Sequence, residues 1–121
     1  MRHLKFNLPG LPRTTNAGNR AHWAAKTKEK NHWHELVWAK VREAKFRGKP
    51  MEKAQLTLTR CSSVEPDFDG LVSTFKHVID GLVQAGVLTN DKVSVIGQPK
   101  YNWVRVPRLK GFIIVEVQEV E

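Results

Sequence analysis

The sequence contains one cysteine and no apolar run long enough to cross a bilayer. A single cysteine, Cys61, excludes an intramolecular disulfide framework and a cysteine-rich zinc site, and it is typical of a reducing compartment. The opening segment, MRHLKFNLPGLPR, also lacks the apolar core of a signal peptide. We therefore expect a soluble, cytoplasmic protein with no membrane partner, in which Cys61 is a small core residue.

Low-complexity tracts and internal repeats are absent as well, and hydrophobic residues make up 40% of the 121 positions. This composition predicts a packed core, and the length predicts a single domain over residues 1–121. Acidic residues are scarce in the first half, where residues 1–50 hold twelve Lys or Arg against three Glu. Such a field is typical of a nucleic-acid partner, because cations displace counterions from phosphates. The alternative is a solvated basic surface that only aids solubility.

Hydrophobic periodicity predicts an α+β fold in the order β-α-β-α-β-β, with two main helices packed on a small mixed sheet. Strands are expected at 2–8, 54–61, 92–97 and 108–120, and helices at about 27–46 and 69–85. The segment QPKYNWVRVP, between the last two strands, extends one of them or forms a hairpin. Gly86 should adopt a left-handed conformation at the end of the second helix. The segment LPGLPRTTNAGNR reads as a long basic loop.

All four aspartates fall within 25 residues, and the second predicted helix arranges them. At 100° per residue its core side carries Leu71, Phe75, Val78 and Leu82, and its opposite side carries Asp69, Ser73, Lys76 and Asp80. Asp67 precedes the helix, where backbone N–H groups favour a carboxylate. Asp91 would approach Asp67 and Asp69 if the strand that follows it pairs beside strand 54–61.

Three converging carboxylates require a positive charge to neutralise them. Oxygen ligands without His or Cys suit Mg²⁺, with Mn²⁺ as a substitute, and such an ion can polarise a phosphoryl oxygen and activate water. Each acid also has a simpler interpretation on its own. Asp69 is an N-cap, Asp80 forms a solvated ion pair with Lys76, and Asn90-Asp91 is turn chemistry.

The segment 67-DFDGLVSTFKHVIDGLVQAGVLTNDKVSVIG-97 resembles the core of the RusA-type Holliday junction resolvases. That family's pattern is Asp-x-Asp-Asn-Leu, then Lys, Asp-Ala-Leu, a Gly and an Asp-Asp pair. The opening LPGLPRTTN also resembles the family's N-terminal Leu-Pro-x-x-Pro signature. The resemblance implies a homodimeric, Mg²⁺-dependent endonuclease of bacteria or phages that resolves four-way DNA junctions by paired nicks. It implies that Asp67, Asp69 and Asp91 are catalytic metal ligands and that Lys76 is a catalytic lysine near the scissile phosphate.

The chain departs from the family pattern at several positions. Gly70 replaces the Asn, Asn90 replaces the first acid of the terminal pair, and Glu65-Pro66 stand where well-known members have arginines. Three extra residues separate Asp69 from Lys76. They turn a helix by about 300°, so the lysine keeps a face close to Asp69 but lies about one turn further along. A second hypothesis is therefore a basic DNA-binding protein of the same fold with lost or altered nuclease activity.

The basic first half is expected to contact the DNA. Residues in or beside the long loop are the candidates, namely Arg13, Asn16, Arg20, Trp23, Lys26, Lys28 and Lys30. Trp23 either stacks on an unpaired base or packs in the core, whereas Trp33 is expected in the core. Trp103 packs in the core or at a dimer contact.

Overall fold

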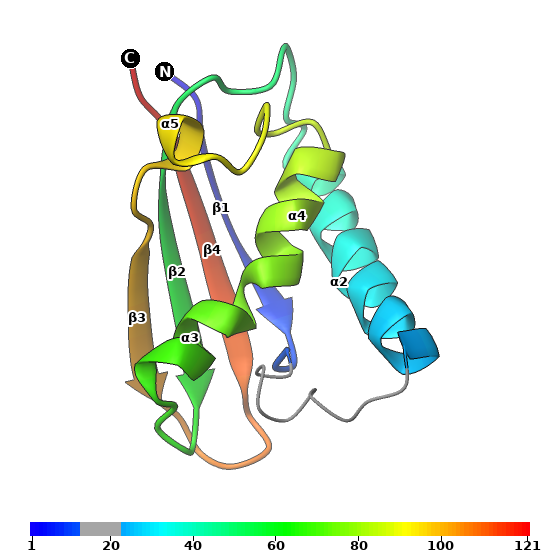
Figure 1. Ribbon diagram of the computed structural model, residues 1–121, viewed down its shortest axis with the longest axis vertical. Helices are drawn as coiled ribbons and strands as arrows, with labels where there is room; N and C mark the ends of the chain where they lie inside the picture. Colours follow the sequence, from blue (N-terminus) through cyan, green and yellow to red (C-terminus); the bar gives the residue numbers. More distant parts are fainter. Residues whose placement is uncertain (13–22) are drawn as a thin grey trace.

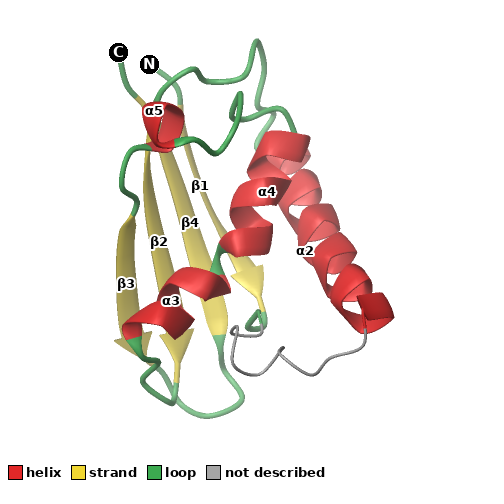
Figure 2. Cartoon of the chain, in the orientation of Figure 1, coloured by secondary structure: helices red, strands yellow, loops and turns green. Residues whose placement is uncertain are grey.

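The computed structural model describes residues 1–12 and 23–121, and within them four strands form one mixed sheet. The strands are β1 (His3–Pro9), β2 (Ala54–Ser62), β3 (Lys100–Arg105) and β4 (Phe112–Glu119), in the spatial order β1-β4-β2-β3. β4 is antiparallel to β1 and to β2, whereas β3 is parallel to β2. The helices pack on one side of this sheet (Figure 1, Figure 2). The α+β class and the mixed sheet are confirmed.

The strands form where apolar and polar residues alternate, and this alternation sets their register. Leu4 lies opposite Val117, which in turn lies opposite Leu56. These three side chains are at most 4% exposed, while polar neighbours face the other side of the sheet. A shift by one residue would turn every buried side chain outward, so the core fixes the register. The strands predicted at 2–8 and 54–61 are confirmed, and the last strand is shorter than 108–120.

The long helix α2 (Trp23–Glu43) covers the region predicted as 27–46, but it begins and ends earlier. Its buried stripe is Trp33, Val37 and Val41, so the core position of Trp33 is confirmed. The helix ends in a Schellman motif. The Phe46 N–H donates to the Val41 carbonyl and the Lys45 N–H donates to the Arg42 carbonyl. Lys45 occupies the left-handed position, with φ 58°.

The helix predicted at 69–85 is divided into α3 (Phe68–Thr74) and α4 (Lys76–Gln84). Phe75 lies between them with φ −100° and ψ 5°, and the chain changes direction there (Figure 1). The four predicted core residues are all buried, with Phe75 fully enclosed. Gly86, with φ 80°, has the left-handed conformation expected of it. The apolar stripe was therefore predicted correctly, and the break within it was not.

The strand predicted at 92–97 is wrong, because this segment forms the single helical turn α5 (Val93–Ile96). The Lys92 carbonyl accepts hydrogen bonds from both Val95 and Ile96, and Gly97 ends the turn with φ 56°. Val95 and Ile96 are both buried, whereas adjacent residues of a strand would point to opposite faces. The sequence QPKYNWVRVP instead supplies the third strand, β3.

Cys61 is buried and reduced, as expected for a core residue. Trp103 is half-buried, and its indole N–H donates to the Ser62 hydroxyl at 3.0 Å. No helix of the described ranges, 1–12 and 23–121, has the length and hydrophobicity needed to cross a membrane.

Candidate functional site

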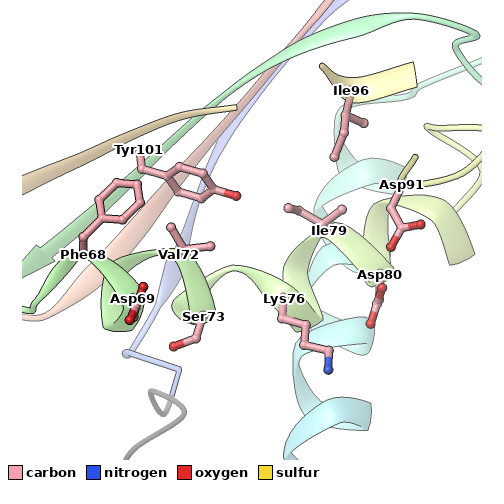
Figure 3. Close-up of a pocket in the computed structure, with 10 residues that line it drawn as sticks. All are labelled: Phe68, Asp69, Val72, Ser73, Lys76, Ile79, Asp80, Asp91, Ile96 and Tyr101. Carbon is pink, nitrogen blue, oxygen red and sulfur yellow. The ribbon is translucent and has the colours of Figure 1, made fainter. Parts of the chain in front are cut away.

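An open depression of about 450 Å³, here called the acidic hollow, lies between α3, α4, the loop before α5 and β3 (Figure 3). Its polar lining consists of Asp69, Ser73, Lys76, Asp80 and Asp91. The first four are the polar face predicted for the second helix, so that prediction is confirmed across the break in the helix. Asp91 comes from a different segment, which makes the hollow a meeting point of residues distant in sequence.

The start of α3 is determined by Asp67. Its carboxylate accepts a hydrogen bond from the Gly70 N–H at 2.7 Å, so Asp67, and not Asp69, is the N-cap. Asp69 therefore lies in the first helical turn, where the positive end of the helix dipole stabilises a carboxylate. Its side chain is exposed and reaches the hollow. Asp67 itself does not line the hollow.

The break at Phe75 positions the next two polar residues. Lys76 is the first residue of α4, and Asp80 follows one turn later on the same face. Lys76 is exposed and Asp80 is half-buried. Within the described part of the chain no ion pair joins them, which differs from the interpretation of Asp80 as the partner of Lys76. Both groups therefore face the hollow without neutralising each other through a direct contact.

The loop before α5 presents Asp91. The Asn90 side chain accepts a hydrogen bond from the Lys92 N–H at 2.9 Å and closes a turn around Asp91. The preceding segment is held by Met51, whose N–H donates to Val87 and whose carbonyl accepts from Thr89. Asn90-Asp91 is thus turn chemistry, as expected, and the turn directs the Asp91 carboxylate toward the hollow (Figure 3).

An aromatic wall closes the hollow on the side of β3. The Tyr101 ring meets Phe68 edge to face at 6.5 Å between centroids and lies 6.1 Å from Phe75. Burial raises the pKa of the Tyr101 hydroxyl, so this group remains protonated as a hydrogen-bond donor at neutral pH. Figure 3 shows the hydroxyl directed into the hollow. Tyr101 gave no signal in the sequence, because β3 was not placed.

A second depression of about 310 Å³ adjoins the acidic hollow, and Asp80 and Asp91 line both. Figure 3 shows the two carboxylates directed toward each other, whereas Asp69 lies beside Phe68 across the hollow. Lys30 and His34 of α2 complete the second depression. Burial, assisted by Lys30, lowers the pKa of His34, while Asp80 opposes this change. His34 is therefore a neutral neighbour of the carboxylates at neutral pH.

The expected ligands Asp67, Asp69 and Asp91 do not form one cluster. Among residues 1–12 and 23–121, no three His, Cys, Asp or Glu side chains are arranged to hold a metal ion. Mg²⁺, however, usually retains several waters and is bound by one or two carboxylates together with substrate phosphates. The carboxylates of the acidic hollow fit that requirement in donor type and in access to solvent. The metal role of Asp67 stays a prediction.

The predicted DNA contacts are described only in part. Lys26, Lys28 and Lys30 are exposed on α2, and Lys30 lies beside the carboxylates in the second depression. Other candidates, Arg13, Asn16, Arg20 and the side chain of Trp23, lie outside the described residues.

No protein-family model matches the chain, and no curated protein matches it. What the molecule itself defines is a small α+β protein with an open hollow that combines three aspartates and one lysine.

Proposed function

We propose that the protein is a Mg²⁺-dependent, structure-selective DNA endonuclease that cuts four-way junctions or other branched DNA by phosphodiester hydrolysis. The observation that carries the proposal is the convergence of Asp69, Lys76 and Asp91 on one open hollow from α3, α4 and a turn. These are three of the four residues to which the family resemblance assigns a role. A nuclease needs carboxylates for a divalent ion and a cation for the phosphate in one accessible place.

The residues of the hollow divide the chemical tasks. Asp80 and Asp91, which line both depressions, would hold Mg²⁺, and Asp69, across the acidic hollow, would bind one of the waters that the ion retains. The bound ion would supply Lewis-acid activation of a phosphoryl oxygen and of water. The Lys76 ammonium, exposed on the rim, would offset the negative charge that develops on the phosphate in the transition state. The protonated Tyr101 hydroxyl would orient a phosphate oxygen.

The charge distribution supports DNA as the substrate. Residues 1–50 carry most of the excess positive charge, and α2 presents Lys26, Lys28 and Lys30 on its exposed surface. Lys30 lies at the end of this basic surface that adjoins the carboxylates, since it lines the same depression as Asp80 and Asp91. Cations beside a metal site attract the backbone of the strand to be cut and hold it in place.

A homodimer is part of the proposal, because two symmetric nicks in a four-way junction require two sites related by a two-fold axis. Light scattering with the four-way junction bound should give the mass of two chains plus one junction. A complex with only one chain would remove the dimer and with it the paired-nick mechanism, while single nicks in a flap would remain compatible with the site.

The direct test is a cleavage assay with four-way, flap and linear duplex DNA in Mg²⁺. We expect cleavage of branched DNA by the natural sequence and its loss in Asp69→Asn and Asp91→Asn. Both variants should still bind the junction in fluorescence anisotropy, because neutralising an acid removes no contact to phosphate. Glu52→Gln, at an exposed residue outside the hollow, is the matched control and should cut normally. Unchanged cleavage by both Asp variants would overturn the site.

A DNA-binding protein of the same fold without nuclease activity is the second candidate. Gly70 and Asn90 replace family residues, and the described acids form no ready three-ligand cluster. Tight, salt-sensitive binding of branched DNA with no cleavage in either Mg²⁺ or Mn²⁺ would favour this candidate.

A further inference from the structure

A further concave surface, here called the basic hollow, lies where the start of β1 meets the residues that follow α2. Its volume is about 460 Å³. Phe46 belongs to its apolar part. The basic side chains that line it are Arg2, His3, Lys5, Lys45 and Arg47. Among the residues that the structure describes, no acidic side chain contributes to the lining. β1 and β3 are the two outer strands of the sheet (Figure 1). The basic hollow and the aromatic wall of the acidic hollow therefore lie at opposite edges.

Only part of this positive charge is compensated within the protein. Arg2 is bound to Glu119 at 2.9 Å, and His3 contacts Glu116 at 2.7 Å. Lys5, Lys45 and Arg47 take part in no ion pair within the described part of the chain. Three uncompensated cations around one concave surface produce a local field that favours a bound anion.

The backbone around the basic hollow is fixed in place. One guanidinium N–H of Arg2 donates to the Arg47 carbonyl at 2.7 Å, and the Arg2 Cζ lies 4.8 Å from the centre of the Phe46 ring. A Cβ added to Gly48 would lie 3.2 Å from the Arg2 guanidinium. Arg2 therefore clamps the segment after α2 to the edge of the sheet, so Lys45 and Arg47 are presented by a held backbone and not by a free loop.

The conformation of Lys45 provides an independent indication of a binding role. It occupies the left-handed position of the Schellman motif, with φ 58°, where glycine is strongly favoured because it has no Cβ. A lysine there costs stability that glycine would recover. Strain of this kind is found where a side chain has a task that stability alone does not require. The side chain in question lines the basic hollow.

We propose that the basic hollow binds a phosphodiester of the DNA backbone, at a position away from the bond that is cut. The proposal rests on the proposed function only in taking DNA as the partner. Three inter-strand spacings separate the two edges of the sheet, about 14 Å in all. Phosphates along one strand rise by about 3.4 Å each. The basic hollow therefore lies about four nucleotides from the aromatic wall of the acidic hollow, and so orients one arm of the substrate.

The test uses variants of Lys45 in the full chain, with fluorescence anisotropy of a labelled four-way junction in EDTA over a range of salt concentrations. Lys45→Gly should weaken binding about 5-fold near physiological salt and lower the slope of log K against log salt by about 0.9, the effect of one lost phosphate contact. The same variant should raise the Tm, because glycine relieves the strain. Lys45→Gln should lose the same affinity without this gain, and Lys45→Arg should bind like the natural sequence.

Lys100→Ala is the charge-matched control, since Lys100 is exposed on β3 at the opposite edge of the sheet. Equal losses of affinity in Lys100→Ala and Lys45→Gln would reduce the effect to net charge and overturn the proposal. Normal binding by Lys45→Gln, or no DNA binding by the natural sequence, would also overturn it. Binding that depends on Lys45 without any cleavage would retain the basic hollow and reject the nuclease. Cleavage of branched DNA together with normal binding by Lys45→Gln would retain the nuclease and reject the basic hollow.

Discussion

Asp67 caps α3 by accepting a hydrogen bond from the Gly70 N–H at 2.7 Å, and Asp69 two residues later faces the acidic hollow. The two acids of the Asp-x-Asp motif therefore differ in what they contact. One carboxylate oxygen of Asp67 is used to begin the helix, and this helix start positions Asp69. The motif thus has a structural part and a part at the candidate site, and substitutions can separate them.

The family resemblance gives Asp67 a metal role in addition to its cap, and on that assignment Asp67→Asn should retain the fold and lose cleavage of the four-way junction. Asparagine caps helices about as well as aspartate, so the change removes the charge and keeps the hydrogen bond. Asp67→Ala removes both, and its free energy of unfolding should fall by about 1 kcal/mol. Chemical denaturation and a cleavage assay on both variants separate the two effects. Normal cleavage by Asp67→Asn would exclude a metal role for Asp67 and show that it serves only as the N-cap of α3.

Much of the fold could be predicted from the sequence, because its strands alternate and because Trp33, Val37 and Val41 recur at helical spacing in α2. The prediction of a strand at 92–97 was wrong for an identifiable reason. Its β-branched residues favour a strand, but the Asn90 side chain and the left-handed Gly97 close a single turn, and this local chemistry prevails over propensity. β3 starts only three residues later, at Lys100, in the segment that was expected to extend a neighbouring strand or form a hairpin.

The sequence predicted which polar residues line the candidate site better than it predicted how the helices arrange them. The helical period placed Asp69, Lys76 and Asp80 on one face, and the structure agrees. The break at Phe75 could not be predicted, because the apolar stripe passes through it without interruption. Tyr101 was missed for a different reason: its contact with Phe75 joins segments whose pairing depends on the whole sheet.

Lys76→Ala should lower the single-turnover cleavage rate by about 10²–10³-fold, the typical cost of removing one group that stabilises transition-state charge. The affinity for the junction should change little, since one exposed cation is a small part of the phosphate contacts. Lys76→Arg should recover part of the rate. An unchanged rate in Lys76→Ala would exclude the lysine from the chemistry.

Ser73 can be used to test whether the three extra residues between Asp69 and Lys76 matter for the position of the lysine. It lines the acidic hollow at the spacing from Asp69 that the family's lysine has. In a Lys76→Ala background, Ser73→Lys should restore part of the cleavage rate, because the ammonium would enter the same hollow from α3. No recovery would show that the position of Lys76 on α4 is specifically required.

The ion pair that joins the two chain ends should make stability depend on pH. Hydrogen bonds from Arg2 lower the pKa of Glu119 from its ordinary 4.5 to about 2. A lowered pKa means that the contribution is fully present above about pH 4.5 and is lost as the pH falls toward 2. The Tm of Glu119→Gln should therefore lie below that of the natural sequence at pH 6, and the difference should disappear near pH 2. A difference independent of pH would contradict the ion pair.

Gly81→Ala should destabilise the protein by about 1 kcal/mol, although alanine in a helix normally gains about 0.5–1 kcal/mol over glycine. The added Cβ would lie 3.2 Å from the Val37 Cβ, where α4 meets the fully buried face of α2, and overpacking costs about 1–3 kcal/mol. Val37→Ala removes the second contact, 3.3 Å to the Val37 Cγ2, and keeps the contact to Cβ, so in that background Gly81→Ala should be less destabilising than in the natural sequence. Denaturant unfolding of the four proteins of this cycle measures the difference. Because Asp80 precedes Gly81, the single variant should also cut DNA more slowly, and the double variant should recover part of that rate.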